Sequence, residues 1–236
     1  MDNKKIAIIQ SNYIPWKGYF DIINSVDEFV IYDDVQYTKN DWRNRNKIKT
    51  PNGVQWLAIP VIHNTSLRIK DVKVLNNLWR RKHWNSLIGN YTKAKYFKDF
   101  KEQFEFLYLR NTEEYLSEIN FVFLKEINKI LNIKTTITWV WDYNLEGDKI
   151  ERIINICKQA NANEYLSGPS AKNYIDEDIF IKNNIKLSWI DYTDYQEYDQ
   201  LYPPFEHGVS IIDLIFNEGE NAIKYMKSFT HNVNNG

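Results

Sequence analysis

The chain has 236 residues, 43% of them hydrophobic and 26% charged, which is enough for one large domain with a substantial core. Its net charge of -1 at pH 7 excludes the overall positive field of a nucleic-acid-binding protein. The single cysteine, Cys157, excludes an intrachain disulfide, and no apolar run approaches about 18 residues, so we predict a soluble cytoplasmic protein without membrane insertion.

The amino-terminal residues predict a βαβ unit. KIAIIQ is an apolar run typical of a buried strand, GYFDIINSVD has apolar residues at helical spacing, and EFVIYDDVQY is β-branched and aromatic like a second strand. Two strands joined through a helix lie parallel. Because ligands bind beyond the carboxyl ends of such strands, we expect a site near residues 10–20 and Asp33-Asp34.

The rest of the chain adds two blocks to this unit. Pro51-Asn52-Gly53 lies between two strand-like runs and predicts a β-hairpin, which we expect as an insertion on the sheet's edge spanning residues 39–75. Residues 76–133 have helical spacing and predict a helical lobe. Strands and helices then alternate. We predict a single α/β domain over residues 1–230 with a mainly parallel sheet, followed by a flexible tail, 231–236.

Several segments, in order, resemble the WbqC-like protein family. The longest is IAIIQSNYIPWKGYFDIINSVDEFVIYDDVQYTKNDWRNRNKI, and the others are WLAIPV, WRRKHW, YTKAKYF, YLSGPSAKNY and SIIDLIFNEG. Together they cover about residues 5–220. The resemblance implies a role in surface-polysaccharide assembly, of the O-antigen type in lipopolysaccharide, beside enzymes that make nucleotide-linked amino sugars.

One departure from the family pattern bears on mechanism. Many relatives have HQPNYLPW where this chain has IQSNYIPW, so the histidine of that pattern is Ile9 here. A mechanism that uses a histidine at the end of the first strand is therefore not carried over.

The loop after the first strand supplies the first candidate ligand-binding residues. Tyr13, Trp16 and Tyr19 either line a ligand site or form a structural corner, and the position at a strand end favours the ligand site. Gly18 is the remnant of a faint likeness to nucleotidyltransferases that carry an HxGH motif, in which a helix N-terminus holds phosphate.

Charged residues supply a second group of candidates. Asp33 is a candidate catalytic carboxylate and Asp34 a candidate ligand for a sugar hydroxyl, although a polar pair that merely ends a strand is the alternative. Arg43 and Arg45 are two residues apart, which places both on one face of a strand where they would grip a phosphate. An exposed hairpin face is the alternative.

His83 is our candidate general base, because it lies within a family segment and histidine titrates near neutral pH. The YLSGPSAKNY segment follows a strand, so its small residues would let backbone amides approach an anion or sugar hydroxyls. The candidate substrate-binding residues of this segment are Ser167, Gly168, Ser170 and Lys172. No Cys/His cluster has zinc spacing, so we expect no metal.

These residues and the resemblance lead us to favour an enzyme that transfers an N-acyl or N-aminoacyl group to a nucleotide-linked amino sugar. A phosphopantetheine-linked acyl donor on an acyl carrier protein would suit the basic segment at residues 39–49, with five basic residues against Asp41. The alternatives are an ATP-using nucleotidyltransferase or ligase and a non-catalytic nucleotide-sugar-binding accessory protein.

Overall fold

The computed structural model describes residues 3–62, 64, 66–173 and 175–230. The predicted tail, residues 231–236, lies outside the described residues. None of the helices within the described ranges has the length and apolar character needed to span a bilayer.

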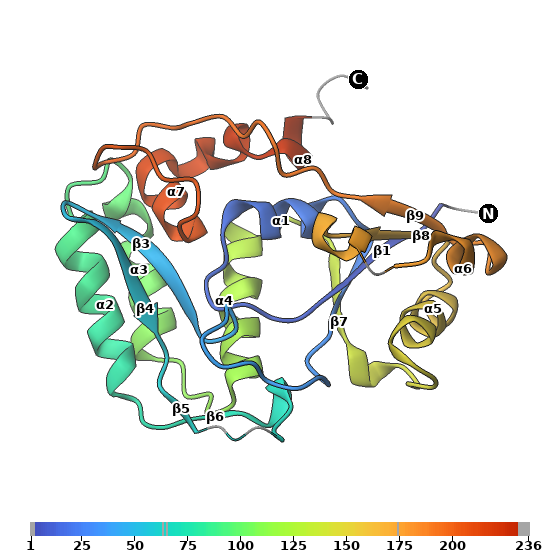
Figure 1. Ribbon diagram of the computed structural model, residues 1–236. Helices are drawn as coiled ribbons and strands as arrows, with labels where there is room; N and C mark the ends of the chain where they lie inside the picture. The colour runs from blue at the N-terminus through green and yellow to red at the C-terminus, as the bar shows by residue number, and fades with distance from the viewer. Residues whose placement is uncertain (1–2, 63, 65, 174, 231–236) are drawn as a thin grey trace.

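A parallel sheet of five strands occupies one half of the molecule (Figure 1). β1 (Lys5–Ile9) lies at its centre, with β2 (Glu28–Ile31) and then β7 (Thr136–Trp139) on one side. On its other side β1 pairs with β8 (Glu164–Ser167), which pairs with β9 (Lys186–Trp189). The prediction of an α/β fold with a mainly parallel sheet built on a βαβ unit is confirmed.

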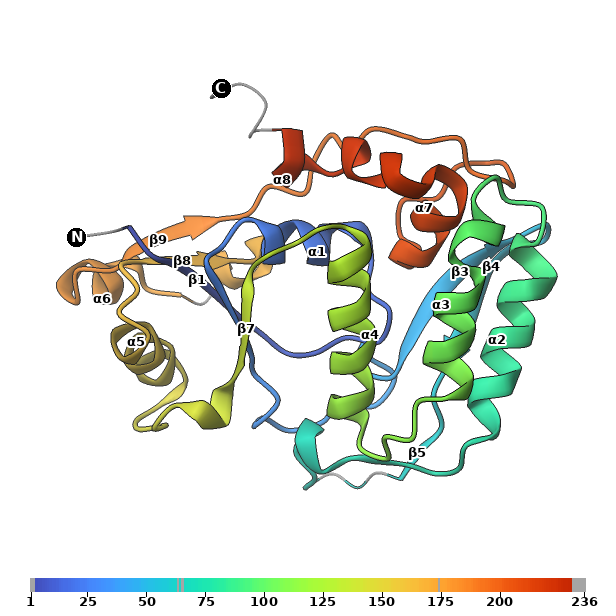
Figure 2. The ribbon, with the colours of Figure 1, turned by 180° about the vertical axis from the view of Figure 1, so that it is seen from behind.

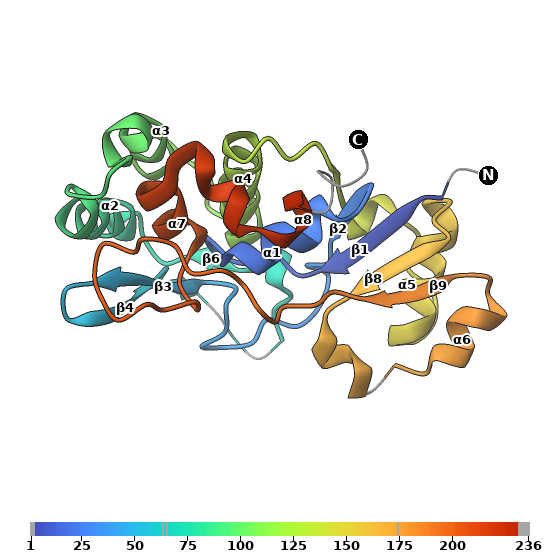
Figure 3. The same cartoon turned by 90° about the horizontal axis from the view of Figure 1, so that it is seen from above.

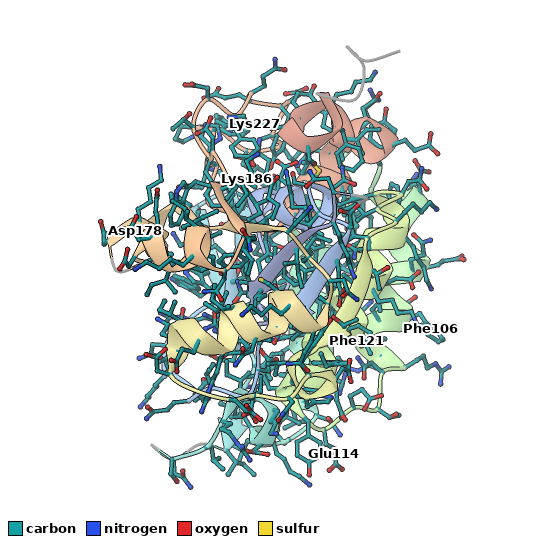
Figure 4. The ribbon with its side chains drawn as sticks, turned by 90° about the vertical axis from the view of Figure 1, so that its right-hand side faces the viewer. Phe106, Glu114, Phe121, Asp178, Lys186 and Lys227 are labelled. Carbon is teal, nitrogen blue, oxygen red and sulfur yellow. The ribbon has the colours of Figure 1, made fainter. Side chains whose placement is uncertain are left out.

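Alternate residues of β1 point to opposite layers, as expected from the period of two in a strand. Ile6 and Ile8 pack with the buried side of α5 (Lys149–Gln159) and with α6 (Glu177–Lys182). Figure 4 looks onto this layer, with α5 in front. Ala7 belongs to the larger core cluster on the opposite face, which includes the crossover helix α1 (Lys17–Asn24).

The helical lobe consists of α2 (Leu78–Tyr91), α3 (Phe97–Leu109) and α4 (Leu116–Ile130) (Figure 2). α4 stands between the other two helices and the parallel sheet. Its residues at positions 119, 123 and 127 are fully buried and follow the helical repeat, so one face of α4 joins the lobe to the core.

The predicted hairpin is present as β3 (Arg45–Thr50) and β4 (Gly53–Ala58), an antiparallel pair. Gly53 closes its turn with φ of 101°, a conformation that favours glycine. The expected position on the edge of the main sheet is wrong, because these strands form a sheet of their own. Ile48 and Leu57 explain the difference, since both are buried in the core shared with the helical lobe.

Short elements complete the chain. β5 (Val61–Ile62) pairs with β6 (Lys73–Val74) after the hairpin, and the carboxyl-terminal helices are α7 (Ile211–Glu218) and α8 (Lys227–Thr230). Figure 3 shows α7 close to the hairpin and α8 close to α1. The backbone N–H of Ser210 donates to the carbonyl of Lys47 at 2.8 Å, so the start of α7 is fixed against β3.

Candidate functional site

The loop after β1, residues 10–16, is held rigidly from several sides. The Tyr13 N–H donates to the Trp42 carbonyl at 3.0 Å, and the Ile211 N–H at the start of α7 donates to the Pro15 carbonyl at 2.9 Å. Asn46 Nδ2 donates to the Ile14 carbonyl at 2.9 Å. These bonds hold Ile14 at φ of 38°, which is strained for a β-branched residue. Such strain is characteristic of functional sites.

Arg43 is part of this rigid loop. Its guanidinium donates to the side-chain oxygens of Gln10, at 3.3 Å, and Asn12, and it lies 3.4 Å from the Ser11 carbonyl. Arg45 instead lies over the Trp56 ring, with Cζ 4.3 Å from the ring centroid. The predicted joint grip of Arg43 and Arg45 on a phosphate stays a prediction, and Arg43 already bonds to three protein oxygens.

A cavity of about 790 Å³ lies at the carboxyl edge of the parallel sheet. We call it the switch-point cavity, because the chain leaves β1 toward β2 on one side while β8 lies on the other. Its wall comes from the ends of β1, β2 and β8 and the amino end of α5. Its polar wall residues are Gln10, Tyr32, Gln36, Asp148, Lys149, Arg152, Tyr165, Ser167 and Ser170, and Gly168 also contributes.

The amino end of α5 gives the switch-point cavity two cations, Lys149 and Arg152. Asp148 caps the helix, and its Oδ1 accepts from the Ile150 and Glu151 N–H groups at 2.8 and 3.0 Å. Those amides are thus already bonded, so the positive charge on this side of the cavity comes from the side chains of Lys149 and Arg152, and Arg152 Nε also donates to the Gly147 carbonyl at 3.0 Å. Burial raises the pKa of Tyr32, and a hydrogen bond from Arg152 partly offsets this effect.

A second cavity, of about 300 Å³, lies on the hairpin side of the same loop. We call it the aromatic cavity, because two indoles, those of Trp16 and Trp42, form much of its wall. The remaining lining residues are Asn12, Pro15, Asn46 and Gly208. Arg43 connects the walls of the two cavities, since it bonds to Gln10 in the wall of one and to Asn12 in the wall of the other.

Tyr13 and His83 are brought together, but in the protein interior. The Tyr13 hydroxyl lies 2.9 Å from His83 Nδ1 and donates to the Tyr108 hydroxyl at 3.0 Å. Burial lowers the pKa of His83 to about 4, although a hydrogen bond to the Ala58 backbone opposes the effect, so the imidazole is neutral at pH 7. His83 is not among the lining residues of either cavity within the described chain.

The two neighbouring aspartates have different surroundings. Asp33 is fully buried, and it accepts from the Ser11 N–H at 2.8 Å and from the Ser117 hydroxyl of α4. Burial raises its pKa, and these hydrogen bonds act in the opposite direction. Asp34 is partly exposed, and its carboxylate pairs with Lys70 at 2.6 Å and with Arg68 at 3.0 Å.

The remaining predicted residues divide between cavity walls and supporting positions. Trp16 lines the aromatic cavity, and Ser167, Gly168 and Ser170 line the switch-point cavity. Gly18 supports Trp16, because a Cβ at position 18 would lie 2.3 Å from the indole. The Tyr19 hydroxyl donates to the Gln10 carbonyl at 2.9 Å. Lys172 has its Nζ 5.6 Å from the Trp189 ring centroid.

Sequence reasoning did not select Arg152, Lys149, Asn12 or Trp42 as cavity residues. A sequence pattern for Arg152 and Lys149 existed. Asp148 and Glu151 form a capping box that starts a helix soon after a parallel strand, so basic residues near this helix start lie at the edge of the sheet where ligands bind. No comparable pattern marked Trp42. Across the described residues, no three His, Cys, Asp or Glu side chains gather into a candidate metal site.

Comparison with known proteins shows to which family this chain belongs. The model of the WbqC-like protein family matches residues 10–225, which includes every lining residue of the aromatic cavity and all those of the switch-point cavity except Ile8 and Ile9. The chain belongs to the WbqC-like family. It is 46% identical to "Uncharacterized protein Rv1507c" of Mycobacterium tuberculosis over 229 residues, covering 95% of this chain and 98% of that protein. No solved structure gives a significant match to this WbqC-like chain.

Proposed function

We propose that the protein binds a nucleotide-linked amino sugar in the switch-point cavity and transfers an acyl or aminoacyl group to the sugar's amine during surface-polysaccharide assembly. The observation that carries the binding proposal is the cavity itself, about 790 Å³ at the carboxyl edge where the strand order reverses. Parallel α/β sheets bind nucleotides at this place, and the volume falls within the range of small-molecule sites.

The wall chemistry supports a phosphorylated ligand. Arg152 and Lys149 supply positive charge, while the backbone around Ser167-Gly168 is small enough for close approach by phosphate or sugar hydroxyls. Tyr32 and Tyr165 add aromatic rings to the same wall. This combination suits a ligand that has both a charged phosphate and a flat or hydroxylated ring.

The transfer chemistry rests on the family resemblance. In acyl transfer from a thioester, the sugar amine attacks the carbonyl carbon, the new C–N bond replaces the C–S bond, and the amine loses one proton. His83 and Asp33 are our predicted proton acceptors; both lie in the interior rather than among the lining residues of the switch-point cavity within the described chain. Their catalytic role stays a prediction.

Replacing Arg152 with alanine is expected to weaken binding of a nucleotide diphosphate sugar by about 10- to 100-fold, because one charge-assisted hydrogen bond is worth roughly 1.5–3 kcal/mol. Calorimetric titration with UDP-N-acetylglucosamine and TDP-linked sugars measures the effect. Lys158→Ala is the matched control, since Lys158 is an exposed cation on the same helix outside this cavity. Equal affinities for wild type and Arg152→Ala would contradict the proposal.

Mass spectrometry separates the transferase from its alternatives. The protein is incubated with a nucleotide-linked amino sugar and an acyl thioester, with and without ATP. We expect a product heavier by one acyl group without ATP. A strict need for ATP would favour the ligase alternative, and binding without any product would favour the accessory protein.

A further inference from the structure

The aromatic cavity is separate from the switch-point cavity and has a different chemical character. Its volume of about 300 Å³ is less than half that of the other, at the lower end of the range for small-ligand sites. A space of this size suits one ring rather than a whole nucleotide. The walls combine flat apolar rings with two asparagine side chains.

Trp42 is the ring that is open to solvent. It is 43% exposed and lies 5.5 Å, between ring centroids, from Trp56, which is 42% exposed. Arg45 and Lys47 lie over Trp56, with Cζ at 4.3 Å and Nζ at 5.3 Å from its ring. The hairpin thus continues the aromatic wall of the cavity outward as a surface of indoles bordered by cations.

The two asparagines fix the polar part of the wall. Arg43 donates to Asn12 Oδ1, which orients the amide, and Asn12 Nδ2 has no hydrogen-bond partner among the described residues. Asn46 is almost fully buried, and its Nδ2 donates to the carbonyls of Tyr13 at 3.2 Å and Ile14 at 2.9 Å. A rigid wall therefore presents an oriented amide donor beside the indole rings.

We propose that the aromatic cavity is a carbohydrate subsite that takes one pyranose ring. The C–H groups on one face of a pyranose carry partial positive charge and pack against the electron-rich face of an indole. The sugar hydroxyls lie at the ring edge, where Asn12 Nδ2 can donate to one of them. The rigid loop and the strained Ile14 keep these groups in place before binding, which reduces the entropic cost of recognition.

Exposure of a tryptophan does not by itself mark this subsite. Trp141 is also 43% exposed, but it stacks on Trp139 at 4.5 Å and does not line the aromatic cavity. What distinguishes Trp42 is the combination of an open ring, an adjoining cavity and an oriented amide. Trp141 is consequently a matched control for Trp42.

The inference rests on the proposed function in one respect: a pyranose is a part of the ligand class proposed for the switch-point cavity. Arg43 bonds to Gln10 and to Asn12, so one guanidinium connects the walls of the two cavities. The ring in the aromatic cavity is thus either the sugar of the nucleotide-linked ligand or a separate sugar.

The test is titration with methyl N-acetyl-β-D-glucosaminide and methyl 4-amino-4-deoxyhexosides, followed by NMR saturation transfer and tryptophan fluorescence. We expect wild type and Trp141→Ala to bind with equal affinity, and Trp42→Ala to lose affinity by about tenfold or more. Trp42→Phe should retain most of the binding, because it keeps a flat ring. The phenylalanine variant also covers the case in which alanine disturbs the hairpin.

Two results would overturn the subsite: no methyl glycoside of this panel binds wild type at millimolar concentration, or Trp42→Ala and Trp42→Phe bind as wild type does. The affinity for UDP alone measures binding to the switch-point cavity, and we expect substitutions of Trp42 to leave it unchanged. Loss of the proposed function would therefore appear as absent UDP binding in wild type, separately from the result with the methyl glycosides. If Trp42→Ala weakens UDP-N-acetylglucosamine but not UDP, the ring belongs to the nucleotide sugar. Methyl glycoside binding that persists under saturating UDP-N-acetylglucosamine identifies a separate sugar.

Discussion

Replacing Asp33 with alanine is expected to lower the free energy of unfolding by about 2–5 kcal/mol, because each buried donor left without an acceptor costs about 1–3 kcal/mol. The donors are the Ser11 N–H in the loop after β1 and the Ser117 hydroxyl at the start of α4. Asp33 thereby links the end of β2 to two other segments, and its loss also loosens the loop that separates the cavities.

The neighbouring aspartate provides the control for this prediction. Asp34→Ala removes ion pairs with Lys70 and Arg68, whose side chains are 27% and 50% exposed, and pairs that solvent reaches in this way contribute about 0–1 kcal/mol. Urea denaturation of wild type and both variants at one pH gives the comparison. Similar losses for Asp33→Ala and Asp34→Ala would show that the buried hydrogen bonds do not have the assigned role.

Replacing His83 with asparagine is expected to remove a pH dependence of stability. The pKa of His83 is about 4 in the folded protein, against about 6.5 for an unperturbed histidine. Between these values the unfolded state binds the proton and the folded state does not. The contribution of His83 to the free energy of unfolding is therefore fully present above pH 6.5. It falls as the pH decreases toward 4, by a total on the order of 3 kcal/mol.

Unfolding free energies at pH 4.5 and 7, measured by urea titration, test this dependence. The difference between the two pH values should be smaller in His83→Asn than in wild type. The variant should also be less stable at pH 7, since the Tyr13 hydroxyl loses its neighbour at Nδ1. Unchanged stability together with a 10²–10⁴-fold loss of acyl transfer would instead identify His83 as the general base.

The fold was predictable where local pattern and global arrangement agree. KIAIIQ and EFVIYDDVQY became β1 and β2, and Pro51-Asn52-Gly53 became the hairpin turn, because alternation and turn chemistry are local properties. The partner of the hairpin was not predictable. The sequence around Ile48 and Leu57 predicts strands, but it does not indicate whether these residues pack against helices or beside an edge strand of the main sheet.

The candidate site was predictable only in part, for a similar reason. Ser167 ends the parallel strand β8 and Gly168 follows it, and a strand end has a known place in such a sheet. His83 is on a helix whose buried side depends on long-range contacts, with Tyr13 seventy positions earlier in the chain. The phosphate-binding role of Arg43 stays a prediction, and its three protein acceptors come from a loop whose path has no sequence signature.

The central position of β1 has a consequence for the order of folding. β1 pairs with β2 a short distance along the chain, but its other neighbour, β8, begins only at Glu164. During synthesis one edge of the central strand therefore remains unpaired until more than two thirds of the chain has emerged, and such open edges promote association between nascent chains. Pulse-labelled hydrogen exchange should find amides of β2 protected before those of β8, and the growing chain depends on its helical lobe, made in the interval, to bury one face of the incomplete sheet.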